Sequence, residues 1–587
     1  MATIVLQAVG SAVGAAVGGP VGAAIGQAIG AAAGSAIDQQ LFGPGDQTVA
    51  GPRLDTARVL SSREGNPVAR VYGRHRVAGD VIWATQLEEV RTSETRSSGG
   101  KASGPKTTVN TYTYFANFAV GLCEGRIGGI GDIWVDGTLL DQTQHTIRLH
   151  TGSDDQLPDA LIEAKQGQGN APAYRGLAYI VFENFTVEDF GNRIPQVAVE
   201  IIRPLNGAER TIRGVNLIPG ASEFAYDPRP VIEQVDDGET RPLNIHQLQA
   251  ESDLLASLDQ LQASCPNLEQ VTLIVSWFGD DLRAGHCTVT PRVETPLRQL
   301  QSGDPWSVAG LSRAQARLVS QKDGRPVYGG TPSDGGVLRA IAEIKRRGLR
   351  VGLNPFLLMD IPEGNALPGL NGEASQPVNP WRGRISAVYS DPDGPTDLTA
   401  NLSAFVGLTP VNSVTVSNGR VQHQGANDWC YRRMVLHFAR LAEIAGGVDV
   451  FLLGSELRGL TASGSALDGF PFVDALVTLA ADIRPFLGEG CTLTYGADWT
   501  EYFGLQTGNG DLVYNLDPLW ASANIDAVGI DAYFPISDWR EDATGLTDER
   551  AQYDGDHLYQ NLASGEGFDW FYASAEDRAN GTRTPIT

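Results

Sequence analysis

A single glutamate follows directly on a continuous apolar run in the stretch VDVFLLGSELRGLT, from Val448 to Thr461. Runs of this kind, without alternation of polar and apolar residues, are typical of a parallel strand covered on both faces. Glu456 comes just after the run, next to Ser455. The pattern predicts that a buried strand places the Glu456 carboxylate at the edge of a sheet, as a candidate catalytic group.

Polar and aromatic residues also follow the other apolar runs in this half of the chain. Aromatic faces stack on pyranose rings, and glycoside hydrolysis uses two carboxyl groups, about 5 to 5.5 Å apart for retention and roughly 6.5 to 9.5 Å apart for inversion. One of the two must have a raised pKa, which a half-buried site provides. We therefore expect a sugar site with Glu456 as the catalytic carboxyl. The substrate-binding candidates are Trp277, Asp280, Asn354, Ser455, Tyr495, Asp498, Asp531 and Tyr533.

The elements around these residues alternate between strand and helix patterns, which indicates a parallel sheet. Expected strands are 271–277, a weaker one at 317–320, 349–358, 449–454, 491–496 and 525–531. Expected helices are 248–265, 334–347, 427–445 and 472–486. The alternation predicts a (β/α)8 barrel over 241–587, incomplete after its sixth strand, with Glu456 facing the barrel mouth. A Pro/Gly/Asn-rich insertion at 361–425 is expected to fold over that mouth.

The preceding part of the chain has a different character. Alternating apolar residues predict a β-rich region over 53–240, with strands at 67–83, 111–122, 133–135, 176–182 and 196–202. Between the first two of these, the Ser/Gly/Lys-rich stretch 91–110 is interpreted as a mobile loop.

The first 43 residues form a separate segment. Residues 4–37 carry no charge, and glycine recurs at every fourth position from Gly10 to Gly34. This glycine zipper predicts an apolar helix that packs closely against others, in an oligomer core or in a membrane. A flexible Gly/Ala-rich arm is the alternative, because glycine and Pro20 disfavour a helix. Packing in an oligomer is preferred to membrane insertion, and the two are compatible.

Composition excludes several classes of function. The net charge of −25 argues against a surface that tracks nucleic-acid phosphates. The five cysteines are scattered without metal-ligand spacing, so we expect reduced thiols and no bound metal. The phosphate-binding G-x-x-x-x-G-K-[ST] pattern does not occur, and no cofactor is expected. No basic stretch precedes the apolar N-terminal run, so no signal peptide is predicted.

Three segments of the β-rich region resemble the hub of tail-tip baseplate proteins. They are NPVARVYGRHRVAGDVIW, YTYFANFAVGLCEGRIGGIGDIWVDG and AYRGLAYIVFENFTVEDFGNRIPQVAVEI. The family includes lambda-type host-specificity proteins and the large "megatron" proteins of gene transfer agents. The resemblance implies a homotrimeric hub that closes the tail tube of a phage-like particle and contacts the distal tail protein and other hub proteins. DNA would only pass through its channel.

A second resemblance concerns the barrel. FLLGSEL and IDAVGIDAYFP look like the fourth and sixth strands of retaining glycosidases with (β/α)8 folds, and like the barrel-like domain named for gene transfer agents. This implies that Glu456 is the acid/base. Ser455 replaces the asparagine that contacts the sugar in those enzymes. Their nucleophile follows a seventh strand, which is expected to lie outside this sequence, and the fallback partners are Asp280, Asp281, Asp498 and Asp531.

Two functions remain open at this point. The first is a baseplate hub whose barrel degrades a cell-wall or surface glycan of the host during DNA delivery. The second is a structural or adhesive hub with an inactive or sugar-binding barrel, whose N-terminal helix acts at the membrane. In the second case Glu456 would simply pair with a nearby arginine such as Arg458.

Overall fold

The computed structural model describes residues 65, 67–97, 106–390, 397–426, 428–465, 467–506, 510–533, 536, 553–562, 570–580 and 582–585. The glycine-zipper helix expected over residues 1–43, and with it the membrane contact proposed for 4–37, lies outside these residues. Among the helices that are described, none is long and apolar enough to cross a bilayer.

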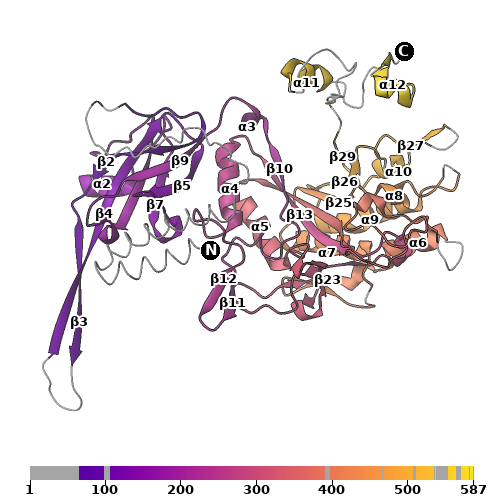
Figure 1. The fold of residues 1–587 in the computed structure, drawn as a ribbon, viewed down its shortest axis with the longest axis horizontal. Coiled ribbons are helices and arrows are strands. Elements are labelled where there is room, and N and C mark those ends of the chain that lie inside the picture. Colours follow the sequence, from indigo (N-terminus) through magenta and orange to yellow (C-terminus); the bar gives the residue numbers. More distant parts are fainter. Residues whose placement is uncertain are drawn as a thin grey trace, which may run out of the picture. The chain divides into compact units, whose positions relative to one another are not determined.

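The β-rich region consists of two antiparallel sheets (Figure 1). One has the strand order β1-β9-β5-β6, formed by Gly73–Ala78, Val197–Arg203, Gly129–Val135 and Thr138–Leu139. The other has the order β2-β4-β8-β7, formed by Asp80–Ala84, Lys106–Glu124, Leu177–Thr186 and Thr146–His150. The rings of Phe118 and Phe182 stack at 4.7 Å in the core of this region. The short helix α2 (Ala160–Gln166) follows β7. The expected β structure is therefore confirmed.

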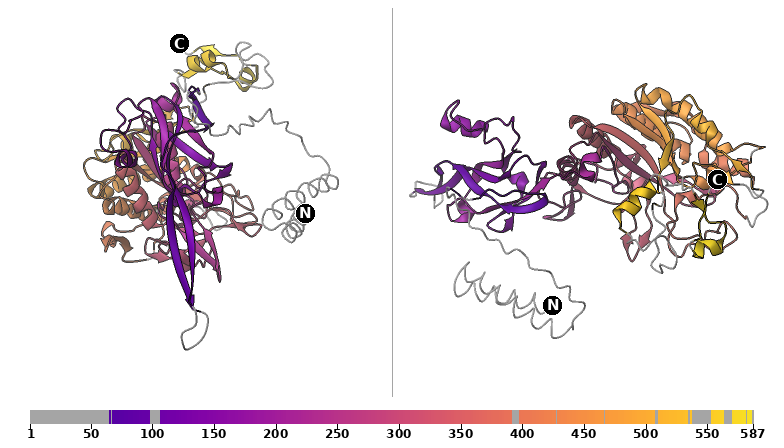
Figure 2. Two further views of the ribbon diagram at one scale, coloured as in Figure 1. Left: turned by 90° about the vertical axis from the view of Figure 1, so that its left-hand side faces the viewer. Right: turned by 90° about the horizontal axis from the view of Figure 1, so that it is seen from above.

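The mobile loop expected at 91–110 is wrong for most of its length. β3 (Glu88–Ser97) pairs with the first half of β4 in an unbroken antiparallel register from Glu88–Phe115 to Ser97–Lys106. Figure 2 shows the two strands as a long ribbon. The stretch contains Thr92, Thr95 and Val109, whose β-branched side chains favour strands even where few apolar residues are present. The Ser/Gly/Lys-rich composition therefore did not reveal the pairing of β3 with β4.

The second half of the chain is built on six parallel strands in chain order, as expected for part of a barrel. They are β10 (Gly214–Leu217), β13 (Gln270–Gly279), β22 (Arg350–Met359), β25 (Val450–Ser455), β26 (Thr492–Asp498) and β29 (Gly529–Asp531). Five of them match the expected strands. The sixth expected strand, at 317–320, is wrong. These residues contain only β19 (Arg317–Leu318), which pairs with β15 (Arg292–Val293) outside this sheet.

The strand missed by the sequence pattern is β10, which pairs in parallel with β13. It is only four residues long and lies in a polar, proline-rich stretch, so it carries almost no periodic signal. Its position means that the parallel sheet begins before residue 241, where the barrel region was expected to start.

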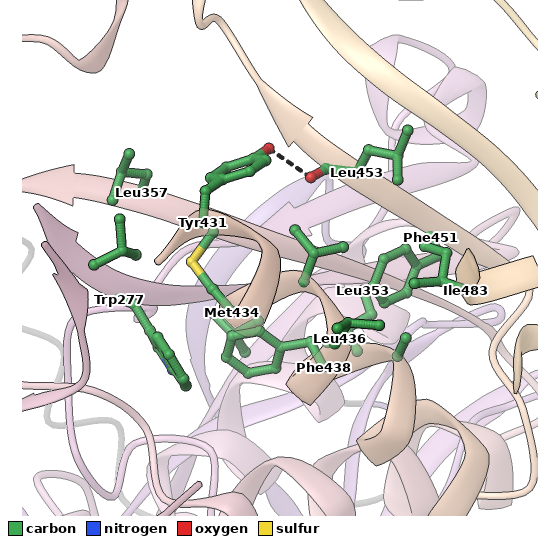
Figure 3. Packing of buried hydrophobic residues seen from close by; sticks show 14 of the residues in the cluster. Trp277, Leu353, Leu357, Tyr431, Met434, Leu436, Phe438, Phe451, Leu453 and Ile483 are labelled. Carbon is green, nitrogen blue, oxygen red and sulfur yellow. Dashed lines mark hydrogen bonds between the residues drawn. The ribbon is translucent and has the colours of Figure 1, made fainter. Parts of the chain in front are cut away.

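The four expected helices are present as α4 (Asp253–Ser264), α5 (Asp334–Arg346), α7 (Tyr431–Ile444) and α9 (Pro471–Leu487). Ser252 and Ser333 cap the first two by accepting backbone N–H groups of the first turn. Apolar side chains of α7 and α9 pack on β22 and β25, where Leu353, Phe451 and Ile483 are buried (Figure 3). This layer fixes the strands that carry the site.

The insertion at 361–425 contains the single turn η5 (Arg382–Arg384), α6 (Leu398–Val406) and the hairpin of β23 (Val414–Ser417) and β24 (Arg420–His423). The segment around η5 reaches the end of β25, where Arg382 donates to the Ser455 carbonyl. The other elements used below are α8 (Arg458–Thr461) and α10 (Asp517–Trp520). The remaining α-helices and strands of the described residues are short. They are α3 (Ala208–Thr211), α11 (Gly555–Leu562), α12 (Ala575–Asn580), β11 (Ile232–Asp236), β12 (Glu239–Pro242), β14 (Val289–Thr290), β16 (Leu300–Ser302), β17 (Ser307–Val308), β18 (Leu311–Ser312), β20 (Gln321–Lys322), β21 (Arg325–Pro326), β27 (Leu505–Gln506), β28 (Leu512–Val513), β30 (Trp570–Phe571) and β31 (Thr584–Pro585).

Candidate active site

The chain makes an unusual turn where β25 ends. Glu456 has a φ of +54°, in the left-handed region that non-glycine residues rarely adopt and that costs about 1–3 kcal/mol. Two residues earlier, Gly454 has a φ of +150°, and a Cβ there would lie 1.9 Å from the hydroxyl oxygen of Tyr431. Only glycine fits at this position. Such strained residues cluster where a side chain must be aimed for function.

Hydrogen bonds with two other elements, β26 and α7, hold this turn. The Glu456 N–H donates to the carbonyl of Gly496 on β26 at 2.8 Å. The Leu457 N–H donates to the hydroxyl of Tyr495 at 2.7 Å. Before the turn, the Tyr431 hydroxyl of α7 donates to the Leu453 carbonyl at 2.6 Å (Figure 3). The backbone on both sides of Glu456 is therefore fixed by groups distant in sequence.

The Glu456 carboxylate is almost buried and contacts one hydrogen-bond donor and one cation from the insertion. Trp381 Nε1 donates to Glu456 Oε2 at 2.5 Å, and Arg382 Nη2 lies 3.0 Å from the same oxygen. Arg382 also donates to the carbonyl and the hydroxyl of Ser455, each at 2.7 Å, and its guanidinium lies 3.9 Å over the Phe356 ring. The ion pair considered with Arg458 is thus made with Arg382, while Arg458 is exposed at the start of α8.

A second carboxyl, Asp531 at the end of β29, faces Glu456. Burial raises the pKa of Asp531 to about 6, the charge of Glu456 and a side-chain hydrogen bond with it act in the same direction, and Arg382 opposes them. Gly496 lies between Ser455 and Asp531, since a Cβ there would lie 3.0 Å from Ser455 Cβ and 3.2 Å from Asp531 Oδ2. Glycine is needed here to leave room for both.

Asp498 is the next carboxyl along this edge. It is paired in register with Asp531 on the neighbouring strand and accepts a hydrogen bond from the Thr500 N–H at 2.9 Å. Its charge contributes to the raised pKa of Asp531. Asp531 therefore lies within range of the charges of Glu456, Asp498 and the cation Arg382.

This arrangement is suited to proton transfer. Two carboxyl groups that share a hydrogen bond titrate as a pair, in which one holds a proton near neutral pH while the other is charged. Trp381 donates to Glu456 and Arg382 pairs with it, so the carboxylate is held in one position. Over the ranges that the structure describes, no group of three or more His, Cys, Asp or Glu side chains could hold a metal ion.

Some of the substrate-binding candidates lie elsewhere. Trp277 is fully buried on the helix side of β13, against Trp429 and Phe438, and does not reach the site. Because side chains alternate along a strand, a residue near a strand end can point into the helix layer instead of the barrel. Asp280 binds Thr288 and Arg317 in the loop after β13, and Asp281 pairs with Arg283.

The remaining candidates have varied positions. Tyr495 is fully buried and supports the backbone of the turn instead of facing a ligand. Asn354 is buried two residues before Phe356, on the same face of β22, and its Oδ1 accepts no hydrogen bond from any residue that the structure describes. Tyr533 is 70% exposed just after β29. Glu456, Ser455, Asp498 and Asp531 are the candidates that the fold brings together.

Three residues of this region were missed by sequence reasoning. Trp381 and Arg382 lie in an insertion without periodic structure, where only the juxtaposition of an aromatic and a cationic residue in WRGR offered a signal. Glu501 is buried behind the turn, and burial raises its pKa to about 7. It follows the end of β26 by three residues, but the sequence pattern drew attention to Asp498 instead.

Comparison with known proteins gives one family match. Residues 429–587, which include β25, β26 and β29, match the family described as the GTA TIM-barrel-like domain. No curated protein matches the chain.

Solved structures give weaker similarities. A structure of the virion of a native gene transfer agent (GTA) particle is 38% identical over 32% of this chain and 39% of that one, with a TM-score of 0.21. A GH113 β-1,4-mannanase complex is 15% identical over 51% of this chain and 59% of that one, with a TM-score of 0.23. The GH113 β-mannanase AaManA from Alicyclobacillus acidocaldarius in complex with ManMIm is 14% identical over 60% and 68%, with a TM-score of 0.27. With TM-scores this low, these structures carry no argument, and the similarity that remains is the family match over residues 429–587.

Proposed function

We propose that this chain, which carries a GTA TIM-barrel-like domain, is a tail-tip hub protein of a phage-like gene transfer particle whose barrel cleaves a host glycan. The family match supports the particle and the barrel. The resemblance of the β-rich region to tail-tip proteins supports the hub, its homotrimeric state and its contacts with other baseplate proteins. The glycan would belong to the cell wall or the cell surface that the particle must cross.

The observation that carries the enzymatic part is the carboxyl pair of Glu456 and Asp531 at the edge of the parallel sheet. In this proposal the proton that Asp531 holds passes through Glu456 to the glycosidic oxygen as the bond breaks. Asp531 supplies this proton and is not the nucleophile, because hydrogen-bonded carboxyls are closer than the roughly 5 Å that a retaining nucleophile needs. The nucleophilic role falls to another residue. Trp381, 38% exposed, offers a ring face to the sugar.

Replacement of Glu456 by Gln tests this role. We expect release of reducing ends from peptidoglycan or surface polysaccharide to fall by about 10²- to 10⁴-fold, the usual contribution of a general acid. Glu443→Gln, on the exposed end of α7 where Glu443 pairs with Arg440, is the matched control and should leave cleavage unchanged. Full cleavage by Glu456→Gln would remove this residue from the mechanism.

A sugar-binding or structural barrel is the second candidate, and one observation favours it. Oε2 of Glu456 already contacts Trp381 and Arg382, and Asp531 also contacts this side chain. Few hydrogen-bonding positions of the carboxyl group are therefore left for a substrate. Calorimetric titration with glycan fragments separates the two functions. Binding that persists in Glu456→Gln, together with no cleavage by the unaltered protein, would establish a binding barrel.

The role proposed for the N-terminal segment is separate. A peptide of residues 2–40 that becomes helical and partitions into liposomes would support action at the membrane. A peptide that stays in solution, combined with a trimeric mass of the full chain in analytical ultracentrifugation, would support oligomer packing.

A further inference from the structure

A buried polar network lies directly behind the Glu456 turn, and Glu501 is its centre. Glu501 is 3% exposed and accepts hydrogen bonds at both carboxylate oxygens. The Tyr495 hydroxyl donates to Oε1 at 3.1 Å, and the Asp498 N–H donates to Oε2 at 3.0 Å. Thr461 Oγ1 also donates to Oε1. A buried carboxyl with this many donors rigidifies the groups that bind it.

The network holds the chain on both sides of the turn. Tyr495 accepts the Leu457 N–H, so Glu501 fixes the residue that follows Glu456 through one intervening hydroxyl. Thr461 is the last residue of α8, the short helix that begins immediately after Leu457. Glu501 thus connects Leu457, the residue that follows the turn, with Thr461 at the end of α8.

The left-handed backbone of Glu456 needs such support. A non-glycine residue in this region persists only where its surroundings over-determine it. The insertion grips the turn at Ser455 through Arg382, but nothing from the insertion contacts Leu457 through a hydrogen bond among the described residues. On that side the support comes from Tyr495 and, behind it, Glu501.

We propose that Glu501 is a positioning residue that acts through Tyr495 and Thr461 to hold the Glu456 carboxylate against Trp381, and so orients it for reaction. The inference rests on the proposed function only where it concerns cleavage. The geometric part, the contact between Glu456 and Trp381, stands independently of any activity.

The test observes this contact directly. The indole N–H of Trp381 donates to Glu456, so its proton and nitrogen shifts report the position of the carboxylate. The full chain is labelled with ¹⁵N-tryptophan, and the Trp381 signal is assigned by its loss in Trp381→Phe. The variants are Tyr495→Phe, Glu501→Leu and Glu501→Gln. Tyr226→Phe is the matched control, because it also removes a buried tyrosine hydroxyl, one that donates to backbone carbonyls of β10 and β13.

We expect the Trp381 signal to move to the position of a weaker hydrogen bond in Tyr495→Phe and Glu501→Leu. In Glu501→Gln it should stay near that of the unaltered protein, since the Gln Oε1 can still accept from Tyr495 and Thr461. Tyr226→Phe should leave it unchanged. Where cleavage is measurable, kcat in Tyr495→Phe should fall by about 10- to 10²-fold with KM little changed, as expected for a misplaced group.

An unchanged Trp381 signal in Tyr495→Phe overturns the proposal, whether or not Glu501→Leu folds. A signal that moves equally in Glu501→Gln and Glu501→Leu also overturns it, because the acceptor geometry would then not matter. Absence of cleavage by the unaltered protein refutes the glycosidase and leaves the Trp381 measurement, and hence this inference, to be decided separately.

Discussion

Substitution of Glu501 by Gln should change how the stability of the barrel region depends on pH. Burial, against the opposing hydrogen bonds, raises the pKa of Glu501 from 4.5 to about 7. Between these values the folded chain holds one proton that the unfolded chain has lost. The free energy of unfolding therefore falls as the pH rises through this window.

The size of the effect follows from the two pKa values. Each unit of difference corresponds to about 1.4 kcal/mol, so ionisation of Glu501 costs about 3 kcal/mol of stability above pH 7. Gln carries no such cost. It places an NH₂ group opposite the Asp498 N–H, which removes about 1 kcal/mol at every pH. The stability of Glu501→Gln relative to the unaltered protein should thus improve by about 3 kcal/mol from acidic to mildly alkaline pH.

Urea unfolding followed by tryptophan fluorescence, over a series of pH values from about 4.5 to about 8, measures this difference. Asp531 is present in both proteins, so its titration largely cancels in the comparison. Glu443→Gln should show no such trend. A stability difference that stays constant over the whole pH range would refute the reasoning that Glu501 holds a proton because it is buried.

Three further outcomes are expected. Asp531→Asn should abolish a titration with a midpoint near pH 6 in the Trp381 indole signal, because the Asp531 carboxyl beside Glu456 ionises there; persistence of the transition would assign it to another group. Gly454→Ala should destabilise the chain by about 2–4 kcal/mol in urea unfolding, since the new Cβ would meet the Tyr431 hydroxyl and break its bond to Leu453. Gly490→Ala, with nothing within 4 Å of the new Cβ, is its control, and equal stabilities would contradict the steric argument. Arg382→Met should cost about 3–5 kcal/mol by leaving Glu456 buried without its cation; a loss below 1 kcal/mol would mean that the pair contributes little.

Sequence patterns were most informative where a long apolar run ended in a carboxyl. The runs before Glu456 and Asp531 placed both residues on one edge of the sheet, because parallel strands in chain order bring their ends together. The same reasoning failed for Trp277, since an unalternating run does not reveal which side chains face the helices and which face the barrel.

Residues that complete the site from other segments were beyond the reach of local patterns. Trp381 and Arg382 belong to an insertion whose course depends on packing, not on periodicity. Glu501 has a role only because Tyr495 and Thr461 converge on it from β26 and α8. The β10 strand was lost for a related reason, because four residues are too few to establish a period.

The contact of the insertion with the end of β25 has a consequence for the order in which the site is made during synthesis. Arg382 and Trp381 leave the ribosome 73 and 75 residues before the groups they bind, Ser455 and Glu456. Asp531 is made later still. Arg382 is therefore available to Glu456 before the second carboxyl exists, and the proton-sharing pair can form only once β29 joins the sheet. Arg382 is thus synthesised before Asp531, whose repulsion with Glu456 it offsets.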